Sequence, residues 1–574
     1  MKRRTASAGG TLLYAALFLA CLYLLLRRLP YGAALDDEAF YLTVPWQMSQ
    51  GSSLVLHQWN TAQLFGFLLW PPVALYRRLN PGAEGIFLHF RLIFLVCHAL
   101  MALLLRLRLK HKSRPGSAAV SLIYLAFVFR GLPCLSYNTM GVGLLILAGL
   151  TLGLSRGKAW EYLLAGLALA GAVLCCPYLA VLYLLYSLAV LVLAALKRSE
   201  SWGGVFSGRA WLLFTAGCGI LAALFFLRIA LYGGLRLLPG MIPLLLAEDP
   251  NQLPGLIPWL RDFYRTLAHS NSYFRPVLLG SLALTAALLP DRGRARRRWL
   301  YLLLAAALTL LYSLTYLLMY RGQNNFIFPL SILGFFAFLL CRREGRLFAF
   351  LYLPGLVYWL CIDLASDLGF SSIYGASAVN MVPSVLVISL LAEELWRESR
   401  ETGGLPRLGR LAAAALSVAA VCLLTLASLR FTFTSDANGL SRWADDTRIT
   451  CGAARGLIAD AQTAADYETE YAALAPLRKK TGGNVLYLTR NSLRFLEDPK
   501  RCVSSNLWFS FVPPEKGFEQ LRQYWEIFPD RRPDEVYLPW ELIDRGYLKG
   551  FAPYPHSEEP VETGVILHMD WSAS

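Results

Sequence analysis

Apolar runs recur along the first 430 residues of this chain of 574 residues, separated by short polar stretches. Most runs hold roughly 16–22 residues, the length that an α-helix needs to cross about 30 Å of hydrocarbon. The pattern therefore predicts an α-helical, multi-pass membrane protein. Thirteen spans are expected, near residues 11–27, 85–105, 117–131, 139–154, 160–175, 178–196, 210–232, 276–290, 299–319, 326–341, 347–362, 378–395 and 411–430.

Segment 61–79 has the length of a span, but Trp70-Pro71-Pro72 lies in its middle. Proline lacks the N–H donor that continues a helix, so we predict a broken helix here. If it crossed the membrane, every later basic loop would lie outside. If it lies on the outer surface, all basic loops face the cytoplasm, as the positive-inside rule requires. These loops are 106–114, 156–158, 197–209, 292–298, 342–346 and 397–410.

This topology places the N-terminus in the cytoplasm and the C-terminal segment outside the plasma (cytoplasmic) membrane. The two largest earlier outer segments are 28–84, with surface helices, and 233–275. We therefore divide the chain into a transmembrane domain, 1–430, and an extracytoplasmic domain, 431–574.

Composition agrees with a membrane protein, since 56% of residues are hydrophobic and only 16% are charged. The net charge of +16 is unevenly distributed. Residues 1–430 hold 38 Lys and Arg against 17 Asp and Glu, whereas residues 431–574 hold 16 against 21. Because the positive excess belongs to the membrane part, it indicates topology, and we expect no nucleic-acid partner.

Residues 431–574 are richer in charge and turns, and predict a small α/β domain. Strand-like runs occupy 484–488 and 535–538, and helical patterns occupy 442–460, 466–480 and 515–528. Cys451 and Cys502 are the cysteines of this segment, and either a disulfide or two free thiols is compatible with the sequence. No metal-binding motif is present, so no metal is expected.

Three consecutive carboxylates, Asp36-Asp37-Glu38, follow the first span and open a short amphipathic pattern that fits a surface helix. Such residues stabilise a helix start by about 0.5–2 kcal/mol, which is one interpretation. The other is that a carboxylate at the membrane surface acts as a general base, accepting a proton from an acceptor hydroxyl or amine.

Several features of residues 10–110 together resemble the GT-C superfamily of membrane glycosyltransferases. They are the charged N-terminus, one span, an Asp-Glu pair opening a helix, a turn at Gly51, an extended piece at 54–57, a Pro-Pro helix, and Arg91 early in the second span. The pattern is most similar to glycosyltransferase family 39, which includes protein O-mannosyltransferases and aminoarabinose transferases.

This resemblance implies a transferase that moves a sugar, with inversion, from a polyprenyl-phosphate donor to an acceptor at the outer face. The catalytic base would be Asp37, with Glu38 as its neighbour and Asp36 as the alternative register. The donor would be a membrane lipid. The acceptor would be a lipid, polysaccharide or protein.

The departing lipid phosphate needs cations or hydrogen-bond donors. Arg321 is the one charged residue of a short polar loop that also contains Asn324, and Arg27 and Arg28 end the first span. Snorkelling at the interface is the alternative role for these arginines. Further candidates for substrate contact are His57, Gln58 and Gln63 from the family comparison, and Tyr137 and Asn138 at the start of the fourth span.

Two departures from the family limit what the resemblance implies. A Glu-Lys pair precedes the Pro-Pro in aminoarabinose transferases and is missing here, so the sugar stays open. The loop 131–138 lacks the acidic residue that many superfamily members carry. Two other classes of protein also stay open: a transporter or lipid flippase, and a non-catalytic component of cell-envelope assembly.

Overall fold

The structure is a computed structural model of the chain. It describes residues 2–33, 35–198, 202–232, 234–247, 256–269, 327–340, 344–365, 371–399, 422–428, 446–480, 482–489, 492–507 and 514–573, with isolated residues or pairs between 303 and 314 and between 408 and 420.

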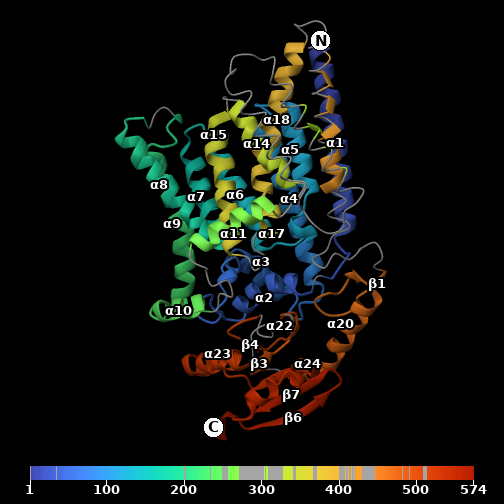
Figure 1. The fold of residues 1–574 in the computed structure, drawn as a ribbon. Helices are drawn as coiled ribbons and strands as arrows, with labels where there is room; N and C mark the ends of the chain where they lie inside the picture. The colour runs from blue at the N-terminus through green and yellow to red at the C-terminus, as the bar shows by residue number, and fades with distance from the viewer. Residues whose placement is uncertain are drawn as a thin grey trace.

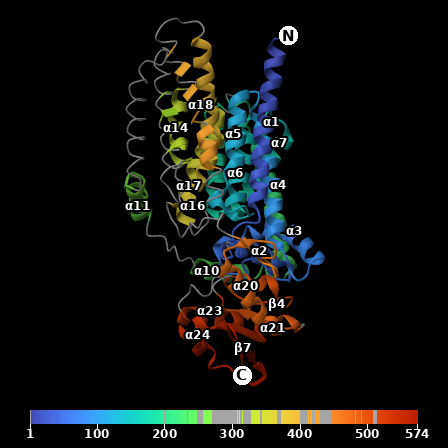
Figure 2. The ribbon, with the colours of Figure 1, turned by 90° about the vertical axis from the view of Figure 1, so that its right-hand side faces the viewer.

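The described chain forms three layers stacked along one axis (Figures 1 and 2). A bundle of long helices holds the N-terminus at its far end, and a small domain with a β-sheet holds the C-terminus at the opposite pole. Helices α2 (Asp37–Ser49) and α3 (Gly66–Leu79) form a thin layer between them. We call the end of the bundle next to this layer the domain end.

Within the described residues, six helices are long and apolar enough to cross a membrane: Gly9–Arg28, Ile86–Leu109, Pro177–Ala195, Gly208–Leu231, Gly345–Leu364 and Ala378–Arg397. Each matches a predicted span. The predicted spans 139–154, 160–175 and 326–341 correspond to shorter apolar helices. Those at 276–290 and 299–319 lie wholly or largely outside the described residues, whereas the described residues of 411–430, which include the run 422–428, are helical.

The helices of the bundle and its periphery have the following bounds: α1 Lys2–Arg28, α4 Ile86–Leu109, α5 Arg114–Ala126, α6 Tyr137–Gly153, α7 Ala159–Cys175, α8 Ala180–Ala195, α9 Gly208–Leu231, α10 Leu238–Ala247, α11 Leu256–His269, α14 Ile327–Leu340, α15 Gly345–Leu347, α16 Leu353–Ala365, α17 Ser371–Ala376 and α18 Ala378–Ser399. Short helical turns occupy Phe129–Gly131, Pro177–Leu179 and, as a π-helix, Phe348–Tyr352.

The third predicted span, 117–131, is only partly helical. Ser113 caps α5 by accepting the Gly116 N–H at 2.7 Å, but the helix ends at Ala126. Phe127 and Val128 continue in an extended form and are buried in the bundle. Non-helical backbone within a membrane must be enclosed by protein, and this segment meets that condition.

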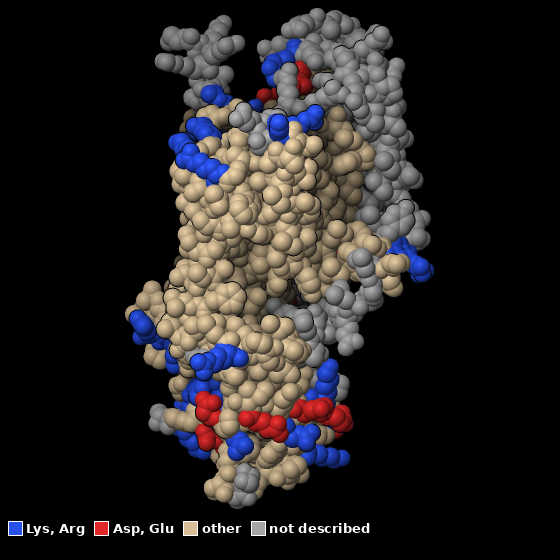
Figure 3. Space-filling model, turned by 90° about the vertical axis from the view of Figure 1, so that its left-hand side faces the viewer, with Lys and Arg blue, Asp and Glu red and all other residues tan. Residues whose placement is uncertain are grey.

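Basic segments that are far apart in sequence meet at the end of the bundle away from the domain. Lys112 pairs with Glu344 at 3.1 Å, and Arg346 donates to the carbonyls of Leu152 and Ser155. Figure 3 shows Lys and Arg at this end, a broad belt without charged side chains, and charges of both signs on the C-terminal domain. This is the grouping that the positive-inside argument predicts, while the side that faces the cytoplasm stays a prediction.

Helix α2 begins where predicted, with Asp36 at its N-cap, but it does not lie on an open surface. Its residues from Glu38 to Met48 are all buried, because the C-terminal domain covers the side that the bundle leaves free. The predicted surface helix is therefore wrong in its exposure.

Two other local predictions for the first outer segment are wrong. Helix α3 continues through Pro71 and Pro72 rather than breaking there, although its 14 residues are too few for a span. The piece at 54–57 is a tight turn and not extended, since His57 N–H donates to the Ser53 carbonyl at 3.0 Å.

The C-terminal domain contains a five-stranded mixed sheet with strand order β4-β3-β5-β7-β6. Strand β3 is parallel to β4 and β5, whereas β7 is antiparallel to β5 and β6. The strands are β1 Thr447–Arg448, β2 Ile458–Ala459, β3 Asn484–Tyr487, β4 Arg501–Cys502, β5 Glu535–Pro539, β6 His556–Val561 and β7 Gly564–Met569. The helices are α20 Ala461–Ala473, α21 Ala475–Lys479, α22 Arg494–Glu497, α23 Pro514–Ile527 and α24 Trp540–Asp544, with 3-10 turns at Pro529–Arg531, Tyr547–Phe551 and Trp571–Ala573. A further 3-10 turn, Thr61–Gln63, lies in the middle layer between α2 and α3.

Both strands predicted in this domain are confirmed, as are helices near 466–480 and 515–528. The helix predicted over 442–460 is wrong, because its described part forms the antiparallel pair β1 and β2. Gly452 and Gly456 adopt φ of 64° and 90°, a left-handed conformation that ends helices and turns the chain. Cys451 and Cys502 are both free thiols.

Glycine allows helices α7 and α9 to approach closely, as small residues do in membrane bundles. A Cβ added to Gly217 would lie 2.2 Å from the Leu163 carbonyl oxygen. Gly219, two residues further along α9, has open space around it. We therefore expect Gly217→Ala to lower the thermal unfolding midpoint in detergent by several degrees, and Gly219→Ala to leave it unchanged or raise it. Equal midpoints for the two variants would contradict this packing.

Candidate functional site

The strongest polar interaction of the middle layer is a buried ion pair between Glu38 and Arg91. The Arg91 Nε and Nη2 atoms lie 2.8 and 2.5 Å from the two Glu38 carboxylate oxygens. The Arg91 side chain is 0% exposed and that of Glu38 is 3% exposed. This two-pronged geometry is the strong form of a carboxylate–guanidinium pair.

Arg91 also binds the turn that follows α1. Its Nη1 donates to the carbonyls of Leu29 at 2.6 Å and Tyr31 at 3.3 Å, and its Nη2 donates to that of Gly32 at 2.7 Å. The guanidinium thus joins the end of α1, the start of α2 and the start of α4. Glu38 is committed to this junction, which makes it a positioning residue and not a free base.

The preceding carboxylates have a different environment. Asp36 and Asp37 are half-exposed, and the Asp36 side chain makes no capping hydrogen bond. Asp37 lies in the first turn of α2, where the helix N-terminus favours a negative charge. Of the adjacent pair, Asp37 is therefore the more exposed carboxylate and the better candidate for the predicted base.

Aromatic rings line α2 one turn beyond Asp37. Tyr41 lies four residues after Asp37, on the same face of the helix. Its ring is 5.4 Å from that of Tyr137 at the start of α6 and 5.8 Å from that of Phe65. Tyr137 therefore packs against the helix that carries the candidate base, and Asn138 is buried beside it in the first turn of α6, while a role of either in substrate contact stays a prediction.

The predicted polar residues of the 57–63 segment have structural partners. Gln63 accepts the Val55 N–H at 2.9 Å and donates to the Gln58 carbonyl at 2.6 Å. Val55 has a φ of 69°, strained for a β-branched residue, and Gln63 holds it there. Gln58 donates to the Gln47 amide oxygen at 2.6 Å and to the Ser504 carbonyl at 3.0 Å.

His57 is buried against the C-terminal domain, with its ring 4.9 Å from that of Phe528. Its Nδ1 accepts the Ser53 N–H at 2.8 Å. Like Gln58 and Gln63, it therefore holds the loop, while a contact of these residues with a substrate stays a prediction.

The predicted cations lie in different environments. Arg27 is exposed on the last turn of α1, whereas Arg28 is buried and donates to the Tyr31 carbonyl. Arg321 and Asn324 lie outside the described residues.

Two further arginines hold α2, and Arg228 is the one that the sequence reasoning missed. Arg77 donates to the Ser49 carbonyl at 2.8 Å, and Arg228, at the end of α9, donates to that of Met48 at 2.9 Å. Arg228 also lies 4.4 Å from the Trp70 ring and 4.0 Å from that of Tyr232. The signal in the sequence that could have identified Arg228 is its position as a cation near the end of the predicted span 210–232.

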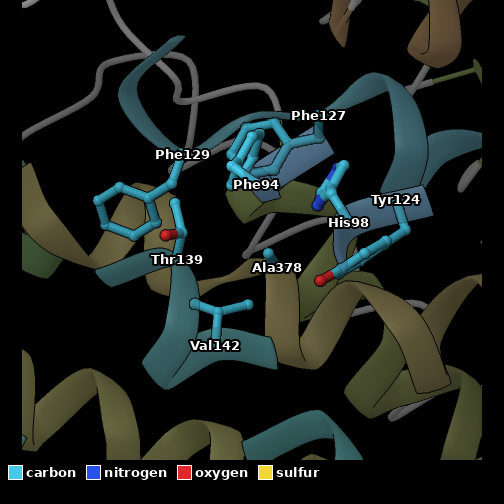
Figure 4. Close-up of a pocket in the computed structure, with 8 residues that line it drawn as sticks. All are labelled: Phe94, His98, Tyr124, Phe127, Phe129, Thr139, Val142 and Ala378. Carbon is cyan, nitrogen blue, oxygen red and sulfur yellow. The ribbon is translucent and has the colours of Figure 1, made fainter. Parts of the chain in front are cut away.

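A small pocket lies inside the bundle, bounded by α4, α6, α18 and the non-helical segment after α5 (Figure 4). His98 lies on the same face of α4 as Arg91, two turns further along. Its ring stacks between Phe94 and Tyr124, at 5.1 and 4.6 Å. The His98 Nε2 atom has no hydrogen-bond partner among the described residues. Also within those residues, no group of three or more His, Cys, Asp or Glu could hold a metal ion.

Comparison with solved structures finds similar chains that match nearly the whole protein. ArnT from Cupriavidus metallidurans, bound to undecaprenyl phosphate, has a TM-score of 0.43 at 13% identity, covering 99% of both chains. The oligosaccharyltransferase AglB from Archaeoglobus fulgidus, in complex with an inhibitory peptide and a dolichol-phosphate, has a TM-score of 0.41 at 12% identity, covering 98% of this chain and 74% of that one. No family model matches the chain, and no curated protein does.

Because the identities are low, the functional conclusion rests on the geometry of this chain's own site.

The Glu38–Arg91 pair allows a direct test of its structural role. We expect Glu38→Gln to destabilise the protein by about 3–5 kcal/mol, because it leaves a buried arginine without its counter-ion. The control is Glu84→Gln, which breaks the exposed pair with Arg455 and changes stability little. Thermal unfolding of the purified variants checks this. A Glu38→Gln midpoint equal to that of the control would contradict the assigned role.

The loop–domain contact at His57 predicts a pH dependence. Burial, assisted by the charges of Arg531 and Arg501, lowers the pKa of His57 from 6.5 to about 2. The folded protein keeps His57 neutral while the unfolded chain takes up a proton below pH 6.5. Stability is therefore lost as pH falls from 6.5 towards 2, by about 1.4 kcal/mol per pH unit.

We expect the drop in unfolding midpoint between pH 7.5 and pH 5 to be smaller in His57→Asn than in the wild type. Asparagine keeps an acceptor for the Ser53 N–H but does not titrate. An equal drop in both proteins would exclude His57 as the titrating group.

Proposed function

We propose that this protein is a membrane glycosyltransferase. It would transfer a sugar from a polyprenyl-phosphate-linked donor to an acceptor hydroxyl or amine, with inversion, using Asp37 as the general base. The observation that carries the proposal is that the two carboxylates of the Asp-Glu pair have different environments. Glu38 is neutralised and fixed by Arg91, while its neighbour Asp37 is left half-exposed on the same rigid helix turn.

The chemistry follows from this arrangement. Asp37 would accept the acceptor's proton as its oxygen or nitrogen attacks the anomeric carbon of the sugar. The bond between that carbon and the phosphate oxygen breaks on the opposite face, and the polyprenyl phosphate leaves with the electron pair. A positioned general base contributes about 10²–10⁴ in rate. Tyr137 and the exposed Arg27 are proposed substrate contacts.

The layer between the bundle and the domain suits a reaction between a lipid in the membrane and an acceptor in the aqueous phase. A lipid donor would enter from the uncharged belt of the bundle, and the acceptor from the side of the charged domain (Figure 3). We propose that this side is the extracytoplasmic face of the plasma membrane, in keeping with the basic residues at the opposite end. The sequence resemblance supplies the donor class, and the sugar is left open.

The test is transfer of radiolabelled sugar from lipid-linked donors by the full-length protein in proteoliposomes. We expect Asp37→Asn to reduce kcat by about 10²–10⁴ while the unfolding midpoint stays unchanged. The matched control is Asp446→Asn, an exposed carboxylate of the C-terminal domain.

Full transfer by Asp37→Asn would reject the base assignment, and loss in Asp36→Asn instead would move it by one residue. Lipid or solute flux by the wild type without a covalent product would support a transporter and reject the transferase.

A further inference from the structure

We propose that the C-terminal domain positions the candidate catalytic helix α2 through hydrogen bonds at both ends of the helix. The domain is then part of the reaction machinery and not only a docking module for the acceptor. The expected effect on catalysis rests on the proposed function, whereas the expected effect on the local stability of α2 does not.

At the start of α2, the domain acts through strand β2. The Ile458 N–H donates to the Pro30 carbonyl at 2.7 Å, and the Gly32 N–H donates to the Ile458 carbonyl at 2.8 Å. This pairing fixes the turn whose carbonyls bind Arg91. Since Arg91 in turn holds Glu38, a continuous series of hydrogen bonds runs from β2 to the residue next to Asp37.

At the end of α2, the domain acts through Arg531, which is 1% exposed. Its Nη1 donates to the Ser52 hydroxyl at 3.0 Å and its Nη2 to the Gly51 carbonyl at 3.1 Å. Gln50 donates to the Lys500 carbonyl at 2.8 Å. Every residue from 50 to 52 is thereby tied to the domain.

Contacts with segment 492–507 continue along the helix and the following loop. The Thr43 hydroxyl, in the middle of α2, donates to the Ser492 carbonyl at 3.1 Å. The Trp59 N–H donates to the Ser505 carbonyl at 2.7 Å. These groups are buried, so each bond would leave unsatisfied backbone or side-chain atoms if the domain moved away.

Helix α2 needs this support because it is a weak helix by itself. It has 13 residues, contains Pro45, and receives no capping bond from Asp36. Short helices are marginal alone, and an internal proline removes a further hydrogen bond. The position of Asp37 therefore depends on groups outside the helix, and the domain supplies many of them.

The experiment compares Arg531→Met with Arg501→Met in the full-length protein. Arg501 belongs to the same domain but pairs at the surface with Asp530 and does not bind the loop. Amide hydrogen exchange over residues 37–52 is measured together with kcat and the KM for each substrate. We expect Arg531→Met to accelerate exchange there and to lower kcat about 10- to 100-fold with little change in KM, since small misplacements of a catalytic group cost this much. Arg501→Met should change neither.

Ser52→Ala, which removes one acceptor of Arg531, is the second variant if Arg531→Met does not fold, and it should accelerate exchange in the same segment. Unchanged exchange over 37–52 overturns the proposal. So does a raised acceptor KM at constant kcat, which would assign a docking role to the domain. A wild type that forms no glycosylated product rejects the proposed function alone, because the exchange data still decide the positioning role.

Discussion

The middle layer of this protein is organised by one buried charge. Arg91 is fully enclosed, and a guanidinium in that position must have all its donors matched, since an unpaired buried charge costs several kcal/mol. Glu38 and the carbonyls of Leu29, Tyr31 and Gly32 provide the match. This requirement fixes where α1 ends, how α2 begins and how both meet α4. It also buries Glu38, whereas the adjacent Asp37 stays partly exposed.

The polar residues around Arg91 differ in burial, and their interactions differ accordingly. Those that contact two layers, such as His57, Gln58 and Arg531, make hydrogen bonds to backbone groups, and in part to side chains, that hold the loops. Asp37 and Tyr137 keep partial exposure at the edge of the same layer. Rigidity and access are thus divided between neighbouring positions, which is what a site that must hold a base in place and still admit two substrates requires.

The sequence was a good guide wherever local pattern controls structure. Apolar length predicted the long helices, charge predicted which loops lie together, and β-branched and aromatic runs predicted β3 and β5. The prominence of Asp36-Asp37-Glu38 also came from composition alone. The local sequence pattern gave wrong predictions where contacts with residues far away in the sequence determine the structure. The burial of α2 depends on a domain that begins more than 380 residues later, as the Thr43–Ser492 bond across 449 positions illustrates. The helix predicted at 442–460 failed because two glycines adopt positive φ, and α3 continues through prolines because its neighbours support it.

The distance in sequence between α2 and the domain has a consequence for how the protein is made. Residues 37–52 leave the ribosome early, whereas the residues that bind them, in segments 446–459 and 492–531, are synthesised much later. The bundle can insert into the membrane while α2 still lacks many of its hydrogen-bond partners. Contacts of such long range form slowly. On the proposed function, the candidate site would therefore be completed only after insertion has ended, and Asp37 would not be held in place while the helices are still entering the bilayer.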